Sequence, residues 1–145
     1  MKLKNLFLTL NLLLILGFGQ HFLGQVNQDW VERYNGSGNS NDEAHSIVVD
    51  GSGNVYATGW GWTAQGLDYI TIKYNSSGVQ QWVQTYNGPG NSLDETSSIA
   101  VDGSGNVYVT GRSTGSGTDY DYATIKYSSS GVQQWVQRYN GYANF

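Results

Sequence analysis

The chain has 145 residues, which is enough for one domain. Glycine is abundant at 20 residues, proline occurs once and aromatic residues make up 14% of the chain, a composition that favours strands joined by glycine turns. The net charge of −4 argues against nucleic acid or anionic lipid as a partner, and the absence of cysteine excludes disulfides and lipid attached to cysteine.

The N-terminal segment predicts a secretory signal peptide. Lysines precede an apolar run without charges at 6–19. A basic start followed by a short apolar run is typical of such signals, and the run is too short to span a bilayer comfortably. We expect residues 1–24 to be the signal, cleaved after Gly19 or Gly24, with an uncleaved membrane anchor as the alternative. The mature chain, 25–145, is then secreted or displayed at the cell surface.

The rest of the chain repeats itself. The stretch DGSGNVYATG at 50–59 returns as DGSGNVYVTG at 102–111, 52 positions later, and the match extends over most of the chain. We expect repeats at about 29–80 and 81–133, and a shortened third repeat at 134–145. A period of roughly 40 to 50 residues is typical of the four-stranded blades of β-propellers.

Four strands are predicted within the first repeat, from an inner strand to an outer one. They lie at 46–50, 55–58, 69–74 and 79–86. The first is a nearly continuous apolar run, as expected of a strand covered on both faces. The last is rich in glutamine, as expected of a strand that faces solvent. Residues 29–34 match this outer strand. We therefore predict an all-β fold, a partial β-propeller of about two four-stranded antiparallel blades plus one extra N-terminal outer strand.

The turn between the first two strands of each repeat has residues suited to a hairpin. Glycine adopts positive φ there, and the aspartate carboxylate accepts backbone N–H bonds across the turn. The spacing also resembles the start of a calcium-binding loop, but Val55 stands where that loop needs glycine. We expect a structural turn and no metal site. The residues to which we assign this role are Asp50, Gly53, Asn54, Asp102, Gly105 and Asn106.

The spaced motifs carry a family resemblance. The pattern Asp-x-x-x-Ser-Ile-x-Val-Asp-x-x-Gly-Asn-Val-Tyr-x-Thr-Gly occurs at 42–59 and again at 94–111. It resembles the bacterial seven-bladed beta-propeller repeat family, often called SBBP repeats. The resemblance implies a secreted or cell-surface propeller and supplies no agreed catalytic residues.

The number of repeats is small for this architecture. A closed propeller needs roughly four to eight blades, and the sequence predicts about two. We expect a C-terminally truncated fragment of a longer propeller protein, with closure by oligomerisation or a short open stack as alternatives. Exposed apolar blade faces would favour self-association.

Two groups of tryptophans have different predicted roles. Trp30, Trp82 and Trp135 recur at one repeat position, which predicts packing within the blades. Trp60 and Trp62 fall in the variable segment, which we expect to be a loop, where exposed rings would stack on a sugar or peptide.

The predicted function is a non-catalytic repeat module for binding or structural scaffolding, with an unknown protein or glycan as ligand. The alternatives are an extracellular carbohydrate-binding module, or the scaffold part of a propeller enzyme whose site lies elsewhere. No catalytic residue, cofactor or metal is predicted. The acidic pairs at 42–43 and 94–95 could serve acid/base chemistry, but their repetition favours capping or turn roles.

Overall fold

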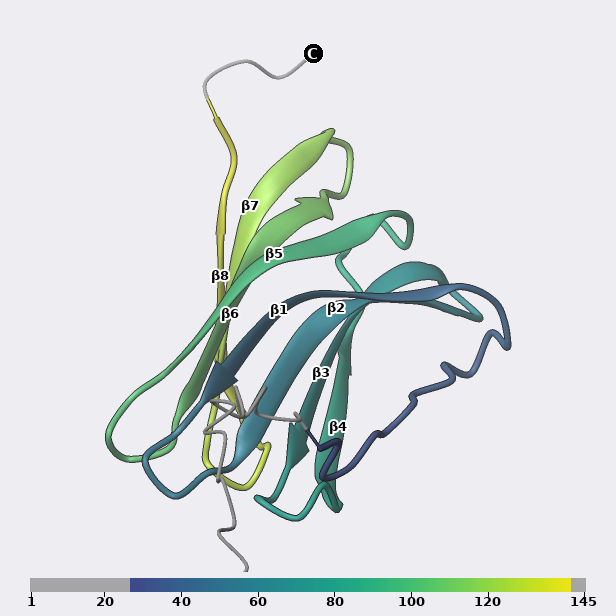
Figure 1. Ribbon diagram of the computed structural model, residues 1–145. Helices are drawn as coiled ribbons and strands as arrows, with labels where there is room; N and C mark the ends of the chain where they lie inside the picture. The colour runs from purple at the N-terminus through teal and green to yellow at the C-terminus, as the bar shows by residue number, and fades with distance from the viewer. Residues whose placement is uncertain (1–26, 142–145) are drawn as a thin grey trace, which may run out of the picture.

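The computed structural model describes residues 27–141, which form two four-stranded antiparallel sheets (Figure 1). The strands are β1 (Asp42–Val49), β2 (Val55–Thr63), β3 (Gly66–Tyr74), β4 (Gln80–Tyr86), β5 (Asp94–Val101), β6 (Val107–Thr114), β7 (Tyr120–Tyr127) and β8 (Gln133–Tyr139). Strand order follows the chain in both sheets, which we call the first blade (β1 to β4) and the second blade (β5 to β8). The prediction of an all-β fold with two four-stranded blades is confirmed. Within the described range no helix could cross a membrane.

The strands run longer than the sequence pattern predicts. β1 begins at Asp42 instead of Ser46, and β2 continues to Thr63 instead of Thr58. A bulge between Ala44 and Ser46 lets the two strands stay paired over this length. Glycine is required opposite the bulge, because a Cβ at Gly59 would lie 1.8 Å from a backbone oxygen of β1.

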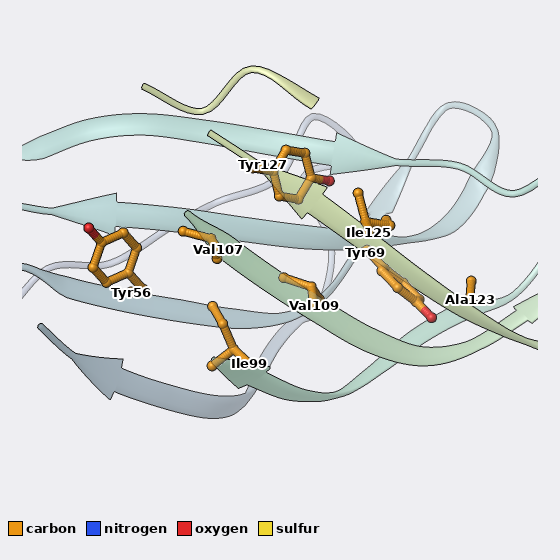
Figure 2. Close-up of a cluster of buried hydrophobic side chains, with 8 residues drawn as sticks. All are labelled: Tyr56, Tyr69, Ile99, Val107, Val109, Ala123, Ile125 and Tyr127. Atoms are coloured by element: carbon orange, nitrogen blue, oxygen red, sulfur yellow. The ribbon is translucent and has the colours of Figure 1, made fainter. Parts of the chain in front are cut away.

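The hydrophobic core lies between the two blades. Five side chains of the second blade are fully buried there, namely Val107, Val109, Ala123, Ile125 and Tyr127. Tyr56 and Tyr69 enter the same cluster from the first blade. Figure 2 shows these side chains converging between the strands of the two sheets. Burying apolar area between the blades is therefore what holds them together.

The outer faces of the two blades are less covered. In β1, the relative exposure of Ile47 is 67% and that of Val49 is 58%, so the prediction that this strand is covered on both faces is wrong. The reason is that β1 packs against β5 on one side only. Ile99 of β5, the counterpart of Ile47, is 8% exposed because the first blade covers it.

The segment before β1 does not form the predicted extra outer strand. Residues 29–34 are described but have no strand structure. An outer strand needs a neighbouring third strand as its partner, and β3 and β7 are already paired with β4 and β8. The expected signal peptide at 1–24, with both cleavage positions, lies outside the described residues.

Candidate functional site

The turn between β1 and β2 is organised by one carboxylate. Asp50 accepts hydrogen bonds from the backbone N of Ser52 (2.9 Å), the backbone N and side-chain amide of Asn54 (3.0 and 2.8 Å) and the hydroxyl of Tyr56 (3.0 Å). These bonds, with that from the Asn54 side chain the largest, lower the pKa of Asp50 to about 2. Gly53 has a φ of 78°, which closes the turn.

The turn between β5 and β6 reproduces this arrangement. Asp102 accepts from the backbone N atoms of Ser104 and Asn106, the Asn106 amide and the Tyr108 hydroxyl, at 2.8 to 3.1 Å. The pKa of Asp102 is likewise lowered to about 2, mainly by the Asn106 side chain. Gly105 has a φ of 77°.

The structure brings the two turns together around an open cavity of about 440 Å³. Lys73 also lines it, and its Nζ donates to the backbone oxygen of Ser129 (3.3 Å) and lies 5.2 Å from the centre of the Tyr56 ring. The carboxylates of Asp50 and Asp102 are held within their own turns by the hydrogen bonds described above. Among residues 27–141 no three His, Cys, Asp or Glu side chains are grouped so that they could hold a metal ion.

Trp82 is the tryptophan that joins the blades. It lies on β4, its ring centre is 6.1 Å from that of Tyr127, and its Nε1 donates to the backbone oxygen of Ser129 (3.2 Å). A Cβ at Gly131 would lie 2.8 Å from the indole, so glycine at this position leaves room for the ring. The contact therefore runs from the outer strand of one blade to the next blade.

Trp30 makes the corresponding contact with the first blade. Its ring centre is 5.9 Å from that of Tyr74, and a Cβ at Gly78 would lie 2.7 Å from its indole. Thus Trp30 packs as the outer strand of a preceding blade would, although its segment is not a strand. Trp135, at the same repeat position on β8, contacts Tyr108 of its own blade and is 38% exposed.

The loop placement predicted for Trp60 and Trp62 is wrong. Both lie in β2, where they pair with Tyr69 and Leu67 of β3. The strand pair extends this far because Gly66, with a φ of 136°, allows a tight turn directly after Thr63.

The rings of Trp60 and Trp62 differ in their solvent exposure and in their hydrogen bonding. Trp62 is 40% exposed. Trp60 donates from Nε1 to Nε2 of His45 (3.0 Å), and Nδ1 of His45 lies 2.8 Å from the backbone oxygen of Thr96 in the second blade. A ring that accepts at Nε2 carries its proton at Nδ1, which then donates to Thr96. Trp60 is thereby tied to the blade junction, and Trp62 is the more exposed of the two rings.

The acidic residues at the start of β1 and β5 bind loop backbone. Asp94 is fully buried and accepts from the backbone N of Gly88 (2.6 Å) and of Thr114 (3.0 Å). Asp42 accepts from the backbone N of Gly36 (2.8 Å). Their repetition therefore reflects the same loop contact in each blade.

Sequence analysis missed one polar cluster at the edge of the second blade. Arg138 donates to the hydroxyl of Tyr86 (2.9 Å), to Ser113 and to the carboxylate of Asp121 (2.9 Å). Asp121 is 7% exposed, so the guanidinium neutralises a buried charge. The available signal was a difference between repeats, because Arg138 stands where the preceding repeat has Thr85.

The comparisons with known proteins agree with this geometry. The SBBP family, described as a beta-propeller repeat, matches residues 29–64 and 81–117, which together make up half of the chain. Each match spans the approach to a blade and its first two strands, including the aspartate-centred turn. No curated protein matches the chain. With two repeats that fold as two four-stranded blades, the chain belongs to the SBBP beta-propeller repeat family.

Proposed function

We propose that the chain is an exported, non-catalytic propeller-repeat module that serves as a binding or structural scaffold outside the cell. The observation that carries the proposal is the equivalence of the polar residues in the two blades. Asp50 and Asp102 make the same hydrogen bonds within their turns, and Asp42 and Asp94 each accept from the backbone N of the equivalent loop glycine, Gly36 or Gly88. Polar side chains that make equivalent hydrogen bonds in both repeats have a structural role in each blade.

Export is proposed from the basic and apolar N-terminal sequence. The test is expression of the full chain in a bacterial host, followed by cell fractionation and N-terminal sequencing of the product. Recovery outside the cytoplasm with a new N-terminus after Gly19 or Gly24 is expected. A cytoplasmic product that retains Met1 would contradict export.

Carbohydrate binding is a second candidate function, favoured by the exposed ring of Trp62. Aromatic rings that are held by a rigid scaffold and open to solvent can stack on the apolar face of a sugar. The backbone at Trp62 is held by pairing with Leu67 of β3 and by a hydrogen bond from the backbone N of Gly38 to the Trp62 oxygen (2.8 Å).

The test is a titration of soluble oligosaccharides monitored by tryptophan fluorescence. Trp62→Ala is expected to abolish the change in fluorescence. Trp135→Ala is the matched control, because Trp135 has nearly the same exposure, 38% against 40%. Equal loss in both variants, or no binding by the wild type, would contradict a sugar site at Trp62.

A further inference from the structure

The contact between the blades centres on one inserted tyrosine. Tyr69 of the first blade is fully buried in the second, its ring centre lies 5.4 Å from that of Tyr86, and its hydroxyl lies 2.9 Å from where a Cβ on Gly111 would be. In Figure 2 its ring lies close to Ala123 and Ile125. Glycine and alanine therefore leave the space that this ring occupies.

The second blade carries the same tyrosine on its free face. Tyr122 occupies the repeat position of Tyr69 and is 69% exposed. Tyr139 and Trp135, the counterparts of Tyr86 and Trp82, are 57% and 38% exposed. This face thus repeats the aromatic side of the internal contact, and no blade packs on it within residues 27–141.

The first blade carries the receiving half of that contact. An open cavity of about 350 Å³ lies on its other face. Its lining includes Tyr34, Ala44, Gly59, Ile70 and Ile72. Ala44, Gly59, Ile70 and Ile72 are the repeat counterparts of Thr96, Gly111, Ala123 and Ile125 in the second blade, where the last three lie next to Tyr69. Tyr34 is the counterpart of Tyr86 and stands where Tyr139 of an incoming copy would lie.

We propose that a second copy of this chain docks on the first blade and inserts its Tyr122 into this cavity. The internal contact of Tyr69 is the template, since both free faces repeat its two halves. The exposed Ile47 and Val49 would be buried as Ile99 is buried within the chain. Because the two faces differ, the contact is head to tail, which generates a ring or a filament.

Docking also requires that β8 of the incoming copy take the place of residues 29–34. Trp30 already packs against Tyr74 and Gly78, where Trp135 of the incoming copy belongs. Residues 29–34 have no strand structure, so β8 of the incoming copy can displace a segment that is not part of either sheet. Trp30 therefore competes with Trp135 of the incoming copy for the same position on the first blade.

The test is the molar mass of the exported mature chain, measured by sedimentation and light scattering over a range of concentrations. The wild type is expected to associate reversibly. Tyr122→Ser removes the inserted ring and should weaken association about thirtyfold or more, as for an aromatic residue at the centre of an interface. Ala44→Phe fills the cavity from an exposed position and should weaken it similarly.

Val132→Ser is the matched control. Val132 is 59% exposed, and its counterpart Val79 remains 57% exposed although the blades pack together, so this variant should associate as the wild type does. Trp30→Ala should strengthen association, and a weakening would overturn the displacement of residues 29–34. Circular dichroism checks that each variant is folded.

A folded wild type that is monomeric at all concentrations would overturn the proposal. So would an association that Tyr122→Ser and Ala44→Phe leave unchanged. The proposed assembly rests on the proposed scaffold function, because it supplies that scaffold with a partner. A chain that is exported and binds oligosaccharide but stays monomeric would overturn the assembly and leave the proposed function standing.

Discussion

Trp82 donates a hydrogen bond from its indole Nε1 to the backbone oxygen of Ser129, 3.2 Å away in the next blade. The ring also packs against Tyr127. Trp82→Ala is expected to lower the free energy of unfolding by about 3 kcal/mol, because it removes a large ring from the contact between the blades. Urea unfolding followed by circular dichroism measures the change.

Trp135→Ala is the control for that prediction, because Trp135 holds the same repeat position on the free face. Its loss should cost about 1 kcal/mol or less in dilute, monomeric protein. Equal costs for the two variants would show that Trp82 contributes nothing specific between the blades.

Acid should weaken the fold through the two aspartate turns. The pKa values of Asp50 and Asp102 are lowered from 3.8 to about 2, so the folded state holds these carboxylates ionised more strongly than the unfolded state does. The stabilisation is present above the unfolded pKa and is lost as the pH falls from about 4 to about 2. Urea unfolding across this range should show the decline.

The double variant Asp50→Asn with Asp102→Asn should be less stable at neutral pH and should lose less stability in acid than the wild type. A wild-type free energy of unfolding that stays constant over the same pH range would contradict the assigned hydrogen bonding.

The glycines of the first turn should differ in their tolerance to alanine. Gly53 has a φ of 78°, and a Cβ there would lie 3.2 Å from Ser76. Gly53→Ala should therefore cost about 1 kcal/mol of stability or more. Gly51→Ala meets no atom within 4 Å and should change stability by less than about 0.5 kcal/mol. Thermal unfolding of the two variants provides the comparison, and the reverse order would contradict the turn geometry.

The two arginine ion pairs should differ in their energetic weight. Arg138→Met leaves the buried carboxylate of Asp121 without its partner and should cost about 3 kcal/mol. Arg112→Met breaks a pair with Glu95 in which the arginine side chain is 51% exposed, so the cost should be below about 1 kcal/mol. Chemical denaturation of both variants tests this, and similar costs would argue against a buried charge at Asp121.

Much of the fold was predictable because the sequence pattern of one blade occurs twice. Alternation of apolar residues and the aspartate turns located all four strands of each blade, and the spacing of the repeats gave the number of blades. The C-terminal end of β2 was missed because the segment around Trp60 and Trp62 differs between repeats and has no clear alternation. Its extension depends on the positive φ of Gly66, which composition alone does not reveal.

The candidate site was less predictable, because its features depend on neighbours in space. The exposure of Ile47 follows from which faces are packed, and the tie between His45 and Thr96 joins residues of different blades. Position in the repeat predicts the same environment for Tyr69 and Tyr122, yet one is buried and the other is exposed.

The central claim is that the two repeats pack face to face through the contact between Trp82 and the second blade. Nuclear Overhauser effects between ring protons measure it most directly, in a spectrum of the mature chain under conditions where it is monomeric. The structure predicts cross-peaks between Trp82 and Tyr127, whose ring centres are 6.1 Å apart, together with those between Trp82 and Tyr56 of its own blade. Cross-peaks to Tyr56 without any to Tyr127 would contradict the packing of the two blades.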